Sequence, residues 1–276
     1  FQGQGIGKQI CDKGIQHLWE MGCDNLVTFV RDDNVASWGT FKKNGFVLTN
    51  LQKVASVIGL LGAMKLYIKT LYGLFDIGHD FYIASAVEQS ASFYKKDGTI
   101  GQVLIYVLLN TLFFLPLVII TQNIFPAIVS SAFVFLGIVF AGYIGTLFSR
   151  RKWNFRFTGG GAILYFIINI FPNLFFPLIG NWYPIHYENT PKFKRDMAIN
   201  VVSVWLFLLC LLIMGKKIEY IPMLLRFVPD IVAVLIILKC LPLPVFESGG
   251  FGRVFKWNKI VFGLLAIASA FFIFIL

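Results

Sequence analysis

Six long apolar runs fill most of the chain after residue 101, and polar residues gather in the stretches between them. The runs cover residues 102–121, 124–148, 160–179, 197–214, 220–241 and 258–276. Each has close to the ~20 residues that a helix needs to cross ~30 Å of hydrocarbon. Because lipid offers no partner to an unpaired backbone amide or carbonyl, a segment that crosses it must be helical. The pattern therefore predicts a mainly α, polytopic membrane protein.

Polar and proline residues break the third run. They are Asn169, Pro172, Asn173 and Pro177. Backbone that is not helical is tolerated at membrane depth only where protein or a water-filled cavity shields it from lipid. We therefore expect this run to be re-entrant or unwound, and the chain to have about five to six membrane helices.

The first 50 residues alternate between helical and extended patterns. Apolar residues recur at helical spacing over Ile6–Met21, and a short β-prone run covers Leu26–Val30. Next, Asp33-Asn34 can cap a second helix, which Asn44-Gly45 would end through a left-handed residue. This order of helix, strand and helix predicts a small α/β piece ahead of the membrane helices.

The segment that follows is less regular. Val54–Ala63 is apolar but too short to span a bilayer, and Lys65 and Lys69 interrupt its continuation. Such a segment suits the membrane interface. The chain thus divides into an α/β half-domain, an amphipathic or interfacial connector and a helical transmembrane domain, at residues 1–50, 51–100 and 101–276.

Composition and charge support a membrane protein. Hydrophobic residues make up 57% of the chain and charged residues 14%, which a soluble chain of this length would not carry. The formal net charge is +10, and the basic residues gather beside Trp and Tyr at the ends of the apolar runs, as expected near anionic lipid. We expect an integral membrane protein with the lipid bilayer as its partner and no nucleic acid; other membrane proteins stay open as partners.

Few residues suggest a metal. In the connector, the side chains that could bind one are Asp76, His79, Asp80 and Glu88. A solvated polar face explains these residues as well and is favoured. A zinc site on a helix needs two imidazoles one turn apart, which the spacing of His17, His79 and His186 does not give. The four cysteines form no C-x-x-C pair and are interpreted as reduced, so we predict no metal.

A Gly-rich turn that feeds a helix opens the chain. It presents several backbone amides to one point, and the helix dipole adds positive potential there. A phosphate or pyrophosphate is the natural ligand of such a turn, although an ordinary loop-to-helix junction has the same pattern. The candidate residues are Gln2, Gly3, Gln4, Gly5, Ile6, Gly7 and Lys8.

Two motifs in this region resemble the second half of the GNAT acetyltransferases. The family's Gln/Arg-x-x-Gly-x-Gly turn is matched by Gln2, Gly5 and Gly7. Its Asn-x-x-Ala-x-x-x-Tyr-x-Lys-x-Gly-Phe motif corresponds to Asn34, Ser37, Phe41, Lys43, Gly45 and Phe46. The resemblance implies acetyl-CoA as cosubstrate, with the amides of Gln2–Lys8 on its pyrophosphate and Asn34 on its pantetheine side.

The chain departs from the GNAT pattern in two ways. Phe41 stands where the family often has a tyrosine as general acid, and phenylalanine cannot donate a proton. The first strands of the family fold would lie before Phe1, so we expect a truncated domain that does not acetylate anything by itself, with its catalytic residues unknown.

The resemblance also implies an orientation in the membrane. Because acetyl-CoA is cytosolic, the N-terminal segment should be cytoplasmic. The basic stretch Arg150–Arg156 then also falls inside, in agreement with the positive-inside rule. Lys192–Arg195 falls outside, unless the third apolar run is re-entrant.

The membrane region diffusely resembles the site-2 protease family. The Pro-rich Leu241–Gly250 followed by the basic Arg253–Asn258 is similar to that family's Asp-Gly-Gly element, with Glu247 or Ser248 nearest to the third zinc ligand. Where the family has His-Glu-x-x-His, the chain reads Ala-Gly-Tyr-Ile-Gly at residues 141–145. The resemblance implies a catalytically dead scaffold, and an unrelated membrane anchor explains the pattern equally well.

Two alternatives therefore stand beside a membrane-tethered GNAT-type acyl-CoA N-acyltransferase. The first is a non-catalytic, site-2 protease-like scaffold that binds other membrane proteins. The second is a transporter subunit, which the broken third run and the residues Arg226 and Asp230 suggest. These two residues are four apart and can pair, so a structural role for them is equally open.

Overall fold

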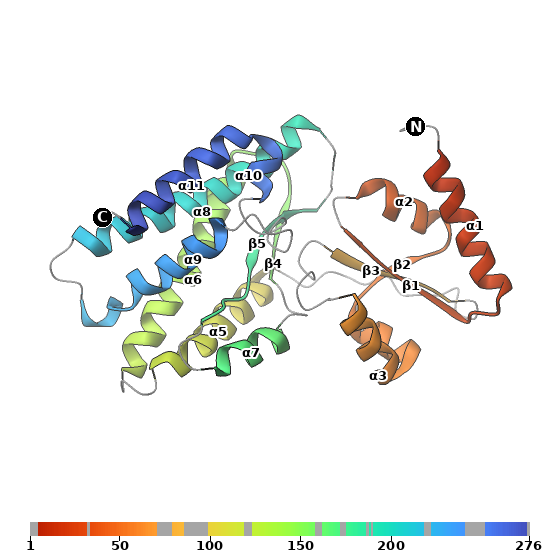
Figure 1. Cartoon of the computed structure of the whole chain (residues 1–276), viewed down its shortest axis with the longest axis horizontal. Helices are drawn as coiled ribbons and strands as arrows, with labels where there is room; N and C mark the ends of the chain where they lie inside the picture. The colour runs from red at the N-terminus through yellow and green to blue at the C-terminus, as the bar shows by residue number, and fades with distance from the viewer. Residues whose placement is uncertain are drawn as a thin grey trace. The chain divides into compact units, whose positions relative to one another are not determined.

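The chain folds into two compact units, Phe1–Lys96 and Asp97–Leu276. The computed structural model describes residues 5–31, 34–70, 79–85, 99–118, 123–157, 162–171, 175–185, 188, 190–217, 222–240 and 252–274. Figure 1 colours the N-terminal unit in red and orange tones and ends the C-terminal unit in blue.

The N-terminal unit combines helices and strands. In chain order its described elements are α1 (Ile6–Glu20), β1 (Asn25–Arg31), α2 (Val35–Lys43), β2 (Val47–Thr49), α3 (Leu51–Lys69) and β3 (His79–Ser85). The predicted helix, strand and second helix are confirmed. Both predicted ends of α2 are confirmed as well, because Asn34 Oδ1 accepts from the Ser37 amide at 3.2 Å and Gly45 has a φ of 81°.

The three strands form one antiparallel sheet in the order β1-β3-β2. The last strand in sequence, β3, therefore lies in the centre. It comes from the segment predicted as a connector, where the sequence suggested a solvated polar face. Residues 81–84 of β3 are all buried, and a strand buried on both faces lacks the apolar–polar alternation by which strands are recognised.

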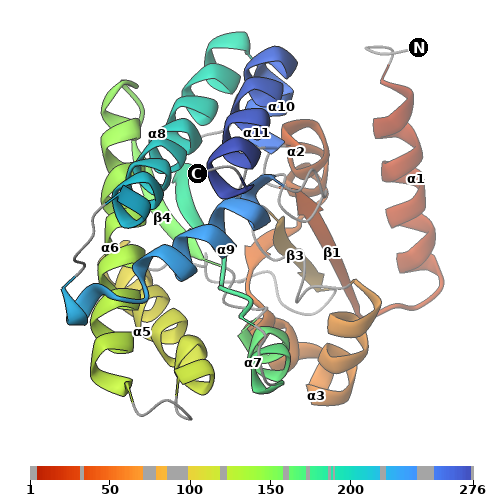
Figure 2. The same ribbon diagram turned by 60° about the vertical axis from the view of Figure 1, so that its left-hand side comes forward.

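The two faces of the sheet carry separate apolar layers, because side chains alternate along each strand. On one face, Leu26 and Tyr82 pack with Ile15 of α1. On the other face, the ring centroids of Phe29 and Phe81 are 4.8 Å apart. Figures 1 and 2 show the sheet between α1 and α2 on one side and α3 on the other, so both faces of the sheet in the N-terminal unit are covered.

A kink divides α3. Asn50 caps its start, where Oδ1 accepts from the Lys53 amide at 2.8 Å. Gly59 then has a φ of 77° and a ψ of 162°, a conformation that glycine adopts far more readily than other residues. The predicted amphipathic segment is therefore helical on both sides of Gly59, and its two halves run in different directions.

The C-terminal unit is mainly helical. Its described elements are α5 (Thr99–Val118), α6 (Ile124–Leu147), β4 (Trp153–Phe157), α7 (Ala162–Ile170), β5 (Gly180–Pro184), α8 (Pro191–Lys217), η1 (Met223–Leu225), α9 (Val228–Cys240), α10 (Gly252–Trp257) and α11 (Lys259–Phe274). Within the described ranges, three helices, α5, α6 and α8, are long and apolar enough to span a membrane. The larger number expected from the sequence is not confirmed.

Prolines and short helices account for the difference. The run 220–241 gives η1, which follows Pro222, and α9, which has 13 residues and carries Pro229 in its first turn. Proline fits the first turn of a helix and breaks its interior, so Pro229 keeps α9 from beginning a full turn earlier. The last run gives α11 with 16 residues. Mean hydropathy does not register these interruptions.

A seam of glycines lets α6 pack closely against α8. A Cβ at Gly145 would lie 2.7 Å from the Cα of Asn200, and one at Gly137 would overlap the ring of Phe207. Small residues allow helix backbones in a membrane to approach closely and gain van der Waals contact. On its other side α6 packs against α5, so α6 is the central helix of the three.

The end of α6 and the start of α8 lie together. Strands β4 and β5 pair antiparallel, and the Ile185 amide donates to the Lys152 carbonyl at 3.0 Å. The Arg151 guanidinium also binds the Glu188 carboxylate at 2.6 Å. The chain between β4 and β5 therefore leaves this end of the unit and returns to it. This path favours a re-entrant third run over one that crosses.

Two buried asparagines satisfy the backbone where the third run is not helical. Asn169 Nδ2 donates to the Phe176 carbonyl at 2.8 Å, and its Oδ1 accepts from the Phe176 amide at 2.6 Å. Asn110 Oδ1 accepts from the Leu178 amide at 2.8 Å. Because buried backbone groups need hydrogen-bond partners, these side chains replace the helical partners that Phe176 and Leu178 lack.

Candidate functional site

The Gly-rich turn forms the start of α1. Gly5 is the N-cap residue, with a φ of 72°, and its carbonyl accepts the first helical bond from the Gln9 amide at 3.1 Å. The next amides, of Ile6, Gly7 and Lys8, occupy the first turn, where amides have no partner within their helix. They point out of the helix end, so the start of α1 offers donors and the positive end of the dipole.

The surface around this turn is open. Gly5, Ile6, Gly7 and Lys8 are all exposed. The positive φ explains glycine at Gly5, whereas Gly7 is helical and a Cβ on it would meet nothing within 4 Å. Within the described part of the chain, nothing therefore requires glycine at position 7, and no described atom fills the space beside it. The other three predicted residues, Gln2, Gly3 and Gln4, lie outside the described residues.

Asn34 and Phe41 of the second motif act within α2. Asn34 is exposed, and its Oδ1 caps the start of the helix. Phe41 is partly buried, and its ring lies edge-on to Phe46 with centroids 5.2 Å apart. A phenyl ring in this apolar cluster supplies packing and no proton. The position that resembles the family's general acid is therefore structural here.

A polar contact that the sequence did not predict joins the two motif helices. Asn44 Nδ2 donates to Asp12 Oδ1 of α1 at 2.7 Å and to the Thr40 carbonyl at 3.0 Å. It ties the end of α2 to the helix that carries the Gly-rich turn. Asp12 and Asn44 are 32 residues apart, so no local spacing could have indicated the pair.

The thiol beside this contact is not activated. Cys11 is a free cysteine that is partly buried in the apolar layer under α1. Burial raises the pKa of the Cys11 thiol, and the neighbouring Asp12 carboxylate raises it further. Because the thiolate is the nucleophile, Cys11 is poorly suited to covalent catalysis.

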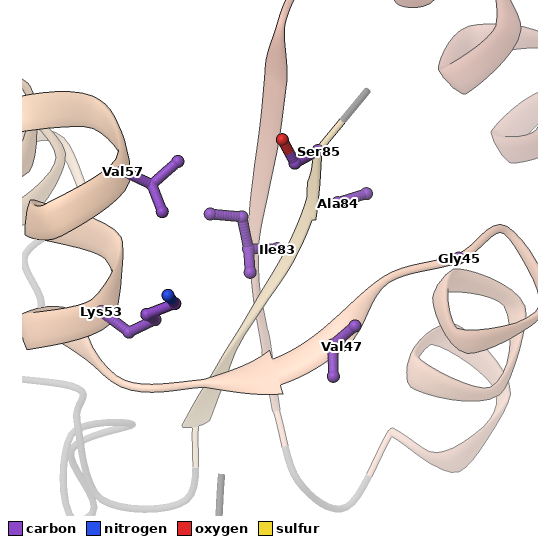
Figure 3. A pocket seen from close by; sticks show the side chains of 7 residues that line it. All are labelled: Gly45, Val47, Lys53, Val57, Ile83, Ala84 and Ser85. Atoms are coloured by element: carbon purple, nitrogen blue, oxygen red, sulfur yellow. The ribbon is translucent and has the colours of Figure 1, made fainter. Parts of the chain in front are cut away.

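A small pocket lies on the α3 side of the sheet (Figure 3). It is lined by Gly45, Val47, Lys53, Val57, Ile83, Ala84 and Ser85. Lys53 and Ser85 are its polar side chains, and the rest of the lining is apolar or glycine. Since the sheet separates it from the α1 face, this pocket is not part of the Gly-rich turn.

The residues weighed as metal ligands do not converge in the part of the chain that the structure describes. No group of three or more His, Cys, Asp or Glu side chains is found within the described ranges. His79 and Asp80 begin β3, while Asp76 and Glu88 lie outside the description. Leu241–Gly250, with Glu247 and Ser248, lies outside it too.

Residues 141–145 of α6 have a packing role. A Cβ at Gly142 would lie 2.8 Å from Cδ1 of Trp182, and the Gly142 carbonyl accepts from Asn200 Nδ2 at 2.6 Å. The segment thus faces α8 and the β4–β5 hairpin rather than an open site. Arg226 and Asp230 form no ion pair in the structure, although their spacing made one possible.

Arg151 binds two carboxylates in the described part of the C-terminal unit. Its Nη1 and Nη2 bind the two oxygens of Glu188 at 2.6 and 3.0 Å, and its Nε binds Asp196 at 3.2 Å. The hydrogen bonding of Arg151 to Glu188 holds the pKa of the Glu188 carboxyl below its usual range. Every contact in this cluster fixes the hairpin to the start of α8, so its role is structural.

Comparison with known proteins bears on the first 46 residues of the chain. The model of the acetyltransferase (GNAT) family matches residues 1–46, which include α1, β1 and α2. No curated protein and no solved structure matches the chain. The site-2 protease resemblance of the membrane region receives no support. The start of the chain is therefore similar to the GNAT family, for which acetyl-CoA is the cosubstrate.

Proposed function

We propose that this protein is a membrane-tethered GNAT-type acyl-CoA N-acyltransferase that binds the cofactor at the start of α1. The observation that carries the proposal is the exposed first turn of α1 within a segment that matches the GNAT family. Amides at the N-terminus of a helix favour a pyrophosphate, and Lys8 adds a full positive charge beside them.

The proposal distinguishes cofactor binding, for which the residues are present, from acyl transfer, which needs a further group. The amides of Ile6, Gly7 and Lys8 hold the pyrophosphate, and Asn34 lines the pantetheine side. Acyl transfer to an amine also needs an acid that protonates the departing thiolate, and Phe41 cannot supply that proton. We therefore expect the chain to bind acetyl-CoA and to transfer the acetyl group poorly or not at all.

The helices α5, α6 and α8 provide the membrane tether. Because acetyl-CoA is cytosolic, the N-terminal unit would lie in the cytoplasm. The two basic stretches Arg150–Arg156 and Lys192–Arg195 then lie on the same side, since the end of α6 and the start of α8 are joined by Arg151 and Glu188. This arrangement agrees with the positive-inside rule.

The test is acetyl-CoA binding by the purified full chain and the variant Gly7→Glu. A carboxylate in the first turn stabilises a helix through its dipole, so the variant keeps its fold. It also places negative charge in the space the pyrophosphate would take. We expect Gly7→Glu to weaken binding at least about tenfold, or about 1.4 kcal/mol, in calorimetric titration.

Gly14→Glu is the matched control. Gly14 lies on the same helix, is exposed, and has nothing within 4 Å of an added Cβ. It should bind acetyl-CoA as the unchanged chain does. Equal affinity of the Gly7→Glu variant and the unchanged chain would overturn the proposal, as would a complete lack of binding by the unchanged chain.

No specific observation supports the other two functions, a scaffold for membrane proteins and a transporter subunit. A scaffold for membrane proteins needs a free binding surface in the C-terminal unit, and a transporter needs a polar path through it. No family model supports either function, whereas the match of residues 1–46 supports the acyltransferase.

A further inference from the structure

The second half of α3 exposes a continuous apolar stripe. Its large side chains have exposed fractions of 71%, 76%, 52% and 67%, for Leu60, Leu61, Met64 and Ile68. These positions recur every three to four residues and so lie on one side of the helix. We call these four residues the α3 stripe. Isolated exposed apolar residues are ordinary, but a full helical stripe of them marks a contact surface.

The stripe does not belong to the core of the N-terminal unit. In the half of α3 after the kink, the buried side chain is Ala63, with an exposed fraction of 4%. Val54, at 0%, is buried on the half before the kink. Both halves of α3 thus bury a residue on either side of the kink at Gly59, while the stripe stays exposed.

The charges beside the stripe are all of one sign. Lys65 and Lys69 are both exposed. Lys65 lies one helical turn after Leu61 of the stripe, and Lys69 lies one turn after Lys65. No Asp or Glu occurs in residues 51–70. Long lysine side chains can lay their methylenes along an apolar surface while their ammonium groups reach outward. Apolar residues flanked by lysine, without acidic residues, complement an anionic lipid surface.

We propose that the second half of α3 lies in the headgroup region of an anionic membrane, with the α3 stripe among the upper acyl chains. The same chain carries three helices able to span a membrane, so a bilayer is the kind of surface that this protein is suited to meet. The inference goes beyond the proposed function and does not depend on it, because its test follows lipid contact and not acetyl-CoA.

The test uses an environment-sensitive fluorophore on the full chain in nanodiscs. The four native cysteines are first replaced by alanine or serine, and one cysteine is introduced by Leu61→Cys or Ser56→Cys. Ser56 is also exposed on α3 but lies before the kink, so it serves as the matched control. Neither position is buried, and both labelled chains should fold.

Lipids with a quencher on the upper acyl chain give the readout. In nanodiscs that contain phosphatidylserine we expect a blue shift and at least about twofold quenching at position 61, for a probe about 5–10 Å below the surface. Position 56 should show neither effect. The further change Lys65→Glu with Lys69→Glu should reduce the quenching, and removal of phosphatidylserine should do the same.

Two outcomes would overturn the inference. In the first, the probe at position 61 stays as exposed to water as that at position 56. In the second, it is blue-shifted without lipid quenching and the shift grows with the number of chains per disc. The second result would assign the α3 stripe to a contact between copies of the protein.

Discussion

Individual asparagines determine the course of the backbone in the C-terminal unit. Asn169 is 2% exposed and binds both the amide and the carbonyl of Phe176. Asn110 is fully buried and accepts from the Leu178 amide. The sequence indicated that the run breaks near Asn169 and Pro172. It did not show what satisfies the freed backbone, because Asn110 is 68 residues away from Leu178.

The change Asn169→Leu removes both bonds to Phe176 at nearly constant side-chain size. We expect it to lower the free energy of unfolding by about 2–4 kcal/mol, since each buried group left without a partner costs about 1–3 kcal/mol. Denaturation in mixed detergent micelles measures the change. Ile167→Val, at an exposed position of the same helix, is the control and should have little effect. Equal stability of the Asn169→Leu variant and the unchanged chain would contradict this role.

Arg253 is a buried cation with incomplete pairing. It is 5% exposed, its Nη1 donates to the Trp182 carbonyl at 3.0 Å, and its guanidinium lies 4.5 Å from the centre of the Tyr183 ring. Among the described residues, its Nε and Nη2 have no hydrogen-bond partner. Because burial of a charge is costly unless it is fully paired, this side chain should stabilise the fold little.

We therefore expect Arg253→Met to keep or raise the stability of the purified chain, by up to about 4 kcal/mol. Methionine retains the length of the side chain and contributes no charge. Arg253→Lys should be the least stable of the three, since it keeps the charge and loses the planar stacking on Tyr183. Thermal unfolding in detergent ranks them. A clear loss of stability in the Arg253→Met variant would mean that the guanidinium has a charged partner in the purified protein.

At the scale of elements, local signals were predictable and distant pairings were not. The ends of α2 follow from Asn34 and Gly45, which act on neighbours three or four residues away. The strand β3 was missed because its pairing partners, β1 and β2, lie far earlier in the chain. The pair β4 and β5 was missed for the same reason. The Gly-rich turn was predictable because one short segment provides all of its amides.

The membrane helices illustrate the limit of hydropathy. Runs 102–121, 124–148 and 197–214 correspond to α5, α6 and α8, the helices able to span a membrane. The other three runs are as apolar but lack an uninterrupted helix of that length in the described residues. Pro229 and Asn169 act there through backbone hydrogen bonding, which a scale of side-chain hydrophobicity does not contain. The five to six spans that the sequence predicted are therefore not confirmed among the described residues.

At the scale of the whole molecule, the spans determine which segments share a side of the membrane. If α5 and α6 both cross, the N-terminal unit and β4 lie on the same side. The pairing of Arg151 with Glu188 then places the start of α8 on that side as well. The helix α8 crosses once more and takes η1 to the opposite side. This order requires that α7 and the residues up to β5 do not cross.

Single cysteines in a cysteine-free chain test this order in sealed cells or vesicles. We expect Lys13→Cys, Lys152→Cys and Lys192→Cys to react with a membrane-impermeant maleimide only from the cytoplasmic side, and Met223→Cys only from the other. All four positions are exposed in the fold, so a cysteine that does not react is protected by the membrane and not by burial in the protein. The comparison of Lys152 with Lys192 decides the matter, because a crossing third run would place them on opposite sides. The comparison of Lys13 with Lys152 independently tests whether α5 and α6 form a complete pair of spans.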